Sequence, residues 1–180
     1  LSGITLSLYG DKGRAVLFEA LDKARDAGVR IAFDTNFRTR GWPDRELAQR
    51  AYRDILNRSD IALASTEDLD LLFGEGGTET LLEDQRPAEL VLKLAKPACR
   101  VMVDGSDELV EARPVETVVD TTAAGDSFAA AYLTARLYGA NPIDAARAGH
   151  RLAGTVVGYR GAIIPRAAMP TDVLKREGLV

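Results

Sequence analysis

An acid that follows a run of small residues is the most chemically suggestive feature of this sequence. Asp126 comes directly after Ala123, Ala124 and Gly125, and the apolar residues beyond it predict a helix that starts here. Backbone N–H groups in the first turn of a helix can converge on an anion, and the helix dipole favours negative charge there. Because a carboxylate repels a bound phosphate, Asp126 is better suited to accept a proton from an attacking hydroxyl group.

The same segment could be an ordinary helix start, in which one polar residue caps the helix and glycine relieves the turn. The sequence offers more than a cap needs, because Asp120, Thr121 and Thr122 precede the small residues. We therefore interpret Ala123–Asp126 as the site of a phosphoryl transfer. The N–H groups of Ala124, Gly125 and Asp126 are its predicted anion hole, and Ala123 is expected to keep a negative φ.

A second polar group follows an apolar run that ends at Phe33. If the chain stays extended past Phe33, Asp34, Asn36, Arg38 and Arg40 all face the same way. They would then lie at the carboxyl edge of a sheet, where open α/β folds bind ligands. The alternative is a polar loop built around an Asx turn.

These groups need a scaffold that brings strand ends together, and the apolar pattern predicts one. Apolar runs alternate with amphipathic helices, which is typical of an α/β fold with a mostly parallel sheet. We expect strands at 1–8, 29–33, 61–64, 100–103 and at Val118-Val119, and helices at 11–27, 44–56, 66–73, 88–95, 125–138 and 142–157. Residues 75–87 are expected to be a polar connection. The interval 104–119 looks short, either because a β-hairpin has been lost or because a mobile segment is missing from the sequence, and both alternatives stay open.

Composition limits the function classes. The 180 residues, 46% of them hydrophobic, suit one globular domain over residues 1–180, and the net charge of -4 argues against nucleic-acid and anionic-membrane partners. The single Cys99 excludes an internal disulfide, and neither a signal peptide nor a membrane-spanning apolar run is evident, so a cytoplasmic location is expected. The oligomeric state stays open, a homo-oligomer included.

The segment Asp120–Asp126 resembles the signature of the ribokinase-like (PfkB) carbohydrate kinases, with Ala123 in place of the first glycine of the usual Asp-Thr-Thr-Gly-Ala-Gly-Asp. This variant, like the tail at residues 159–170, is similar to that of the 2-keto-3-deoxygluconate kinases within the family. The resemblance implies a three-layer α/β/α fold and the use of ATP and Mg²⁺. It also implies phosphorylation of a primary hydroxyl group of a sugar acid, such as 2-keto-3-deoxygluconate to its 6-phosphate.

The resemblance also implies roles for other residues. In the matching loop of such kinases the asparagine approaches the nucleotide phosphates and the arginine reaches the substrate, so Asn36 is expected to bind nucleotide and Arg38 the sugar acid. Asp68 occupies the last position of a motif that helps to hold Mg²⁺, although Ser65 and Asp68 also fit a capping box. His150 is expected to form a wall of the adenine pocket.

Two alternatives stay open from the sequence. The loop that contains Arg38 looks the same in fructokinases, so a fructokinase or another ribokinase-like sugar kinase is the first alternative. Leu1–Leu8 looks like a strand already under way, and the family's N-terminal strands and substrate lid are expected to be absent from these residues. The second alternative is therefore a nucleotide-binding fragment without turnover.

Overall fold

The computed structural model of the chain describes residues 1–84 and 87–171. It divides into two compact units, which we describe separately. Unit 1 contains Leu1–Ala95 and Met102–Ser106, and unit 2 contains Lys96–Val101 and Asp107–Val180. The expectation of a single domain over residues 1–180 stays a prediction.

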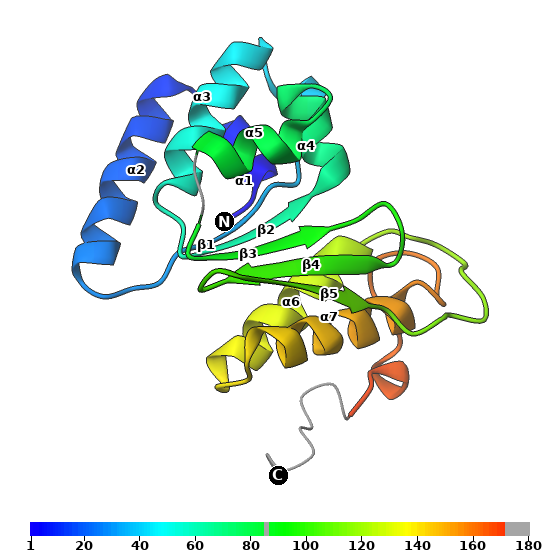
Figure 1. Ribbon diagram of the computed structural model, residues 1–180. Coiled ribbons are helices and arrows are strands. Elements are labelled where there is room, and N and C mark those ends of the chain that lie inside the picture. Colours follow the sequence, from blue (N-terminus) through cyan, green and yellow to red (C-terminus); the bar gives the residue numbers. More distant parts are fainter. Residues whose placement is uncertain (85–86, 172–180) are drawn as a thin grey trace. The chain divides into compact units, whose positions relative to one another are not determined.

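Three parallel strands form the centre of unit 1. They are β1 (Ala32–Asp34), β2 (Ile61–Ser65) and β3 (Glu89–Lys93), which follow one another in chain order in the sheet. The helices of this unit are α1 (Gly3–Leu8), α2 (Asp11–Asp26), α3 (Arg45–Leu56), α4 (Thr66–Phe73) and α5 (Gly77–Asp84), with a 3-10 turn, η1, at Thr39–Gly41 (Figure 1). Parallel pairing places the carboxyl ends of the three strands at one edge of the sheet.

The core of unit 1 lies between its strands and helices. Phe33 of β1, Tyr52 of α3, Leu69 of α4 and Leu90 of β3 are all completely buried. Tyr52 packs edge-on against the ring of Phe33, with the ring centroids 5.5 Å apart. This packing fixes the end of β1, where the polar residues that follow Phe33 begin.

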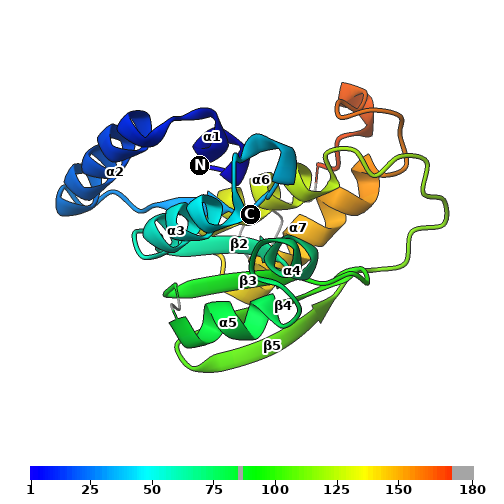
Figure 2. The same ribbon diagram turned by 90° about the horizontal axis from the view of Figure 1, so that it is seen from above.

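Unit 2 contains two helices and the greater part of a strand pair, whose hairpin end at Met102–Ser106 belongs to unit 1. β4 (Ala98–Val103) and β5 (Ser106–Glu111) are neighbours in the sheet, and the helices are α6 (Ala124–Leu137) and α7 (Pro142–Val156), with a 3-10 turn, η2, at Arg166–Ala168. α6 and α7 lie side by side (Figures 1 and 2). Gly149 of α7 permits this contact, because a Cβ there would come within 2.8 Å of the Phe128 ring on α6.

Most of the predicted helices are confirmed together with the residues that start them. Asp44 accepts a hydrogen bond from the N–H of Leu47 at 2.7 Å and caps α3. Asn141 caps α7 in the same way, by accepting from the N–H of Asp144. These side chains satisfy N–H groups that have no partner inside the helix, which explains why such residues mark helix starts.

The predicted strand at Leu1–Leu8 is wrong for most of its length. Only Ser2 pairs with Asp34, as an isolated parallel bridge, and Gly3–Leu8 forms α1. The apolar run does not alternate in burial, since Leu6 is buried whereas Leu8 is 79% exposed. One buried face therefore requires a helix rather than a strand here.

Two further predictions between residues 75 and 95 are wrong. The expected polar connection contains α5, whose Leu81 is buried, and the expected helix at 88–95 is β3. Four consecutive buried residues start β3, a pattern that a strand covered on both faces shares with a short buried helix. The interval after Val103 does contain a second hairpin strand, β5, because Asp104 and Gly105 both adopt a positive φ and form a two-residue turn.

Among the residues that the structure describes, no helix combines the length and the apolar character needed to cross a bilayer. Cys99, the single cysteine of the sequence, is buried. Its thiol lies in strand β4, away from solvent.

Candidate functional site

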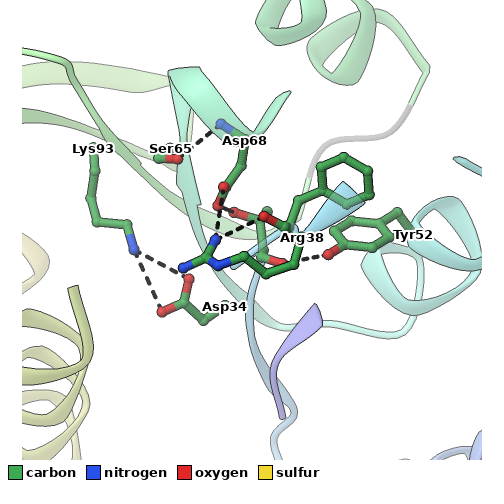
Figure 3. Close-up of polar contacts among 8 residues, drawn as sticks. Asp34, Arg38, Tyr52, Ser65, Asp68 and Lys93 are labelled. Atoms are coloured by element: carbon green, nitrogen blue, oxygen red, sulfur yellow. Dashed lines mark hydrogen bonds and ion pairs between the residues drawn. The ribbon is translucent and has the colours of Figure 1, made fainter. Parts of the chain in front are cut away.

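Polar side chains that follow Phe33 lie at the carboxyl edge of the unit 1 strands, as predicted for Asp34 and Arg38 (Figure 3). Asp34 ends β1, Ser65 ends β2 and Lys93 ends β3. Ser65 pairs in register with Lys93, so these two strands end level with each other. Figure 3 shows that the side chains of Asp34, Arg38, Asp68 and Lys93 lie in this region.

A chain of contacts joins the loop after β1 to the start of α4. The Thr35 hydroxyl donates to Oδ2 of Asp68 at 2.8 Å, and Oδ1 of Asp68 lies 3.7 Å from Nη1 of Arg38. Nη1 of Arg38 also donates to the carbonyl oxygen of Phe37 at 2.8 Å. Arg38 is thus held on one edge of its guanidinium group, although its side chain is 60% exposed.

Tyr52 supports this loop from the core. Its hydroxyl donates to the carbonyl oxygen of Thr35 at 2.6 Å, and its ring also contacts those of Phe37 and Trp42. Burial, followed by the nearby charges of Asp68 and Asp34, raises the pKa of Tyr52 far above its usual range. This shift favours the protonated phenol, the form that donates to the carbonyl oxygen of Thr35.

Asp34 and Lys93 form a second cation–carboxylate contact in the same group. Nζ of Lys93 lies 3.2 Å from Oδ1 of Asp34 and 3.5 Å from Oδ2. Both side chains are at least four-fifths buried, so solvent screens this pair less than a surface pair. The contact crosses the end of β2 and ties β1 to β3.

The extended chain on which the predicted row of four polar side chains depends is interrupted at Asn36 and again at Thr39. Residues 33–37 alternate between buried and half-buried positions, but Thr39–Gly41 turns into a 3-10 helix, so Arg40 does not continue the row. Asn36 has a φ of 32°, a left-handed conformation that asparagine tolerates better than most residues. Its side chain is half-buried.

Two roles were predicted for Asp68, one in helix capping with Ser65 and one in holding Mg²⁺. Ser65 accepts a hydrogen bond from the N–H of Asp68 at 3.1 Å, so the helix-capping alternative is confirmed for Ser65. The described residues contain no cluster of three acidic, histidine or cysteine side chains that could enclose a metal ion. One carboxylate with an arginine 3.7 Å away fits a Mg²⁺ ion that keeps its water shell better than a directly bound one.

The predicted Ala123–Asp126 site lies in unit 2, where α6 begins. Ala123 precedes the helix with a φ of 61°, so the expected negative φ is wrong. The N–H of Ala124 donates to the carbonyl oxygen of Thr121 at 3.1 Å, which removes it from the predicted anion hole. The predicted strand before the turn is wrong too: Val118 and Val119 are exposed and lie outside every strand.

Two backbone donors remain at the start of α6. Within the described part of the chain, nothing accepts a hydrogen bond from the N–H groups of Gly125 and Asp126. The carboxylate of Asp126 is exposed in the first turn of the same helix. An anion bound here would meet two N–H groups and the positive end of the helix dipole, next to an accessible carboxylate.

Asp120 holds this turn in place. Its carboxylate accepts from the N–H of Thr122 and from the N–H of Gly161, both at 2.8 Å. It thereby joins the two segments in which the family resemblance was found. The Thr122 hydroxyl, followed by the N–H groups of Gly161 and Thr122, lowers the pKa of Asp120 to about 2.

This lowered pKa predicts a pH-dependent contribution to stability. The Asp120 contacts should stabilise the fold fully above the ordinary pKa of 3.8, and the contribution should disappear as the pH falls through about 2. We expect Asp120→Asn to lower the free energy of unfolding at pH 6, and the difference from the parent to shrink towards pH 2. Urea unfolding across this range measures it, and a difference that does not change with pH would contradict the assignment.

The conformation of Ala123 predicts opposite effects for two neighbouring substitutions. A Cβ at positive φ costs about 1–2 kcal/mol, part of which the freer unfolded state of glycine offsets. Ala123→Gly should therefore leave the free energy of unfolding unchanged or raise it by up to about 1 kcal/mol. Ala124→Gly, inside the helix, should lower it by about 0.5–1 kcal/mol. Chemical denaturation of both variants checks the prediction, which fails if both are destabilised equally.

His150 is held by unit 2 itself. Nε2 lies 3.1 Å from the carbonyl oxygen of Val110 in β5, and the ring packs edge-on against Phe128 with centroids 5.0 Å apart. Burial lowers the pKa of His150, with a smaller opposing effect from the Val110 carbonyl. These contacts give His150 a packing role, and its expected contact with adenine stays a prediction.

Three residues of these groups were not predicted from the sequence. Thr35 and Lys93 follow or end buried strands, and Lys93 would have been noticed if residues 89–93 had been assigned as a strand. Asp120 stands two residues before Thr122, a spacing typical of an Asx turn. The sequence around each of these residues contains a signal, but this local signal does not show which distant residues each one contacts.

Comparisons with known proteins agree with this architecture. The model of the family described as "pfkB family carbohydrate kinase" matches residues 4–169. The 2-dehydro-3-deoxygluconokinase of Dickeya dadantii is 44% identical over 177 residues, which are 94% of this chain and 57% of that protein. The chain thus spans a little over half the length of this curated relative.

Two solved structures show the same fold. Fructokinase from Vibrio cholerae with bound fructose, ADP and calcium matches with a TM-score of 0.81 and 22% identity, over 97% of this chain and 58% of that one. A putative ribokinase II from E. coli in complex with ATP and Mg²⁺ matches with a TM-score of 0.72 and 24% identity, over 89% and 52%. The predicted α/β, ribokinase-like fold class is thereby confirmed.

Proposed function

The chain belongs to the pfkB family of carbohydrate kinases, and from this we propose that it supplies the phosphoryl-transfer residues of a sugar-acid kinase. The reaction would transfer the γ-phosphoryl group of ATP to a primary hydroxyl group, converting 2-dehydro-3-deoxygluconate (2-keto-3-deoxygluconate) to its 6-phosphate. The observation that carries the proposal is the start of α6, where two unpartnered N–H groups adjoin the exposed Asp126 carboxylate. The similarity to the Dickeya dadantii kinase supports the choice of substrate.

Asp126 is the proposed base. Phosphoryl transfer spreads negative charge over the oxygens of the transferred group, so the protein contributes mainly positioning and charge neutralisation. The N–H groups of Gly125 and Asp126 supply donors for that charge, and the positive φ of Ala123 directs the chain into the helix. The hydroxyl proton of the substrate passes to the Asp126 carboxylate as the oxygen bonds to phosphorus and the bond to ADP breaks.

Arg38 is the proposed ligand for the carboxylate of the sugar acid. The contacts to Asp68 and Phe37 both involve Nη1, and among the described residues Nε and Nη2 have no partner. Nε and Nη2 form one edge of the planar guanidinium group, which matches a carboxylate with two parallel hydrogen bonds. Fructose has no carboxylate for this edge to bind.

ATP and Mg²⁺ are the proposed cofactors, as in the E. coli structure that holds both. Asn36 would approach the nucleotide phosphates, and His150 would line the adenine pocket. Asp68 would hold the metal through water, and the ion would neutralise phosphate charge when bound. The amide of Asn36 and the imidazole of His150 can form hydrogen bonds with a nucleotide, and the carboxylate of Asp68 can accept hydrogen bonds from the water shell of Mg²⁺.

Identification of the product tests the proposal. The full-length protein, incubated with ATP, Mg²⁺ and 2-dehydro-3-deoxygluconate, should form ADP and a sugar acid heavier by one phosphoryl group. Phosphorus NMR should show the new phosphate as an ester of the primary carbon. ADP formation that does not depend on the sugar acid, or nucleotide binding without any product, would contradict it.

A further inference from the structure

We propose that Thr35 is a positioning residue for substrate recognition: acting through Asp68, it orients Arg38 to receive the carboxylate of the sugar acid. The inference rests on the proposed function, because it concerns how the same site selects its substrate. It assigns a role to a residue that cannot itself reach the substrate.

Thr35 is completely buried, and each of its polar groups is engaged. Its N–H donates to the carbonyl oxygen of Leu63 in β2 at 3.0 Å, and its own carbonyl oxygen accepts from Tyr52. Its hydroxyl donates to Asp68. Backbone contacts to β2 and α3 therefore fix the position of the hydroxyl before any ligand binds.

Asp68 transmits this position to Arg38. The Ser65 cap fixes the backbone of Asp68 in the first turn of α4. The cap does not by itself fix the direction of the Asp68 carboxylate. The Thr35 hydroxyl holds Oδ2, and the opposite oxygen, Oδ1, then faces Nη1 of Arg38. Only 13% of the Asp68 side chain is exposed, so the orientation is set inside the protein rather than by solvent.

The consequence for Arg38 is a guanidinium group that is anchored but accessible. Figure 3 shows Arg38 extending between Asp68 and the Asp34–Lys93 pair, with dashed contacts on its Asp68 side. Immobilising a long, flexible side chain on binding costs affinity, and anchoring it beforehand reduces that cost. Without the Thr35 hydroxyl, Asp68 would rotate and Arg38 would lose its fixed direction.

Thr35→Val in the full-length protein tests this inference, because valine keeps the shape and removes only the hydroxyl. We expect the KM for 2-dehydro-3-deoxygluconate to rise about tenfold, as for the loss of a hydrogen bond to a charged group, while kcat and the KM for ATP change less than about twofold. Thr35→Ser restores the hydroxyl and should restore the KM. Thr78→Val, a change of a buried threonine in α5, is the matched control for folding effects.

Asp68→Asn gives an independent measurement if valine disturbs folding. It should raise the KM for the sugar acid to a similar degree, and the double variant with Thr35→Val should show little further increase, because the two residues act in series. An unchanged sugar-acid KM in Asp68→Asn would overturn the inference, whether or not the Mg²⁺ requirement rises as the proposed metal role expects.

The failure of this inference can be distinguished from the failure of the proposed function. If Thr35→Val leaves the KM unchanged while Arg38→Lys raises it, Arg38 binds the substrate without help from Thr35, and this inference is wrong. If neither substitution changes the KM for the sugar acid, the role of Arg38 in the proposed function is wrong as well.

Discussion

Asp126→Asn should lower kcat by about 10²- to 10⁴-fold, the range typical of losing a general base. Asparagine has nearly the same size and leaves the backbone N–H groups of the α6 start in place, so the anion hole is retained. It cannot take up the hydroxyl proton of the substrate. The KM values for ATP and for the sugar acid should therefore change much less than kcat, which steady-state kinetics of the full-length protein will show.

Asp144→Asn is the matched control, because Asp144 occupies the first turn of α7 as Asp126 does in α6. Both substitutions remove an acid from a helix N-terminus. Asp144→Asn also weakens the contacts of Asp144 with Asn141 and Arg147, so it should lower stability at least as much as Asp126→Asn. Turnover near that of the parent in Asp126→Asn would remove the base assignment. Equal losses of turnover in the two variants would mean that stability, rather than chemistry, explains the effect.

Arg38→Lys should raise the KM for the sugar acid by about 10- to 100-fold and leave the KM for ATP nearly unchanged. Lysine keeps the positive charge but offers one point of attachment, whereas the Nε–Nη2 edge of Arg38 can bind both carboxylate oxygens. The loss should appear with a sugar acid and should be small with a neutral sugar. Initial rates with each substrate varied in turn will separate the two constants.

Arg40→Lys is the control for this experiment, since Arg40 is exposed in η1 two residues further along. It should behave like the parent with both substrates. An equal rise in the KM for ATP and for the sugar acid in Arg38→Lys would contradict the substrate role, and would indicate that the arginine supports the loop as a whole.

The fold could be predicted where a local pattern had one physical explanation. Asp44 and Asn141 predicted helix starts correctly because a side-chain oxygen in front of a helix satisfies unpaired N–H groups. The helix predicted at residues 88–95 was wrong because a short apolar run is compatible with either a strand or a helix until its neighbours are known. The strand predicted at residues 1–8 was wrong for the same reason. Leu6 is buried whereas Leu8 is exposed, and this difference is decided by packing in three dimensions.

The candidate site was predictable in its residue types but not in its connections. Arg38 and Asp68 were both expected to act, yet their contact could not be inferred, because 29 intervening residues are brought back by the pairing of β1 with β2. The φ of Ala123 was predicted with the wrong sign because the usual cost of a Cβ was taken to decide it. Ala123 adopts this costly positive φ at the start of α6, where the N–H groups of the first helical turn point outward.

The central claim is that this chain contributes to a kinase for a sugar acid rather than for a neutral sugar. Its most direct test is the ratio of kcat/KM for 2-dehydro-3-deoxygluconate to kcat/KM for fructose, measured for the full-length protein in one ATP-coupled assay. We predict a ratio of about 100 or more, since a site built around Arg38 would leave its guanidinium edge unpaired with fructose. A ratio at or below one would contradict the account and assign the chain to a fructokinase.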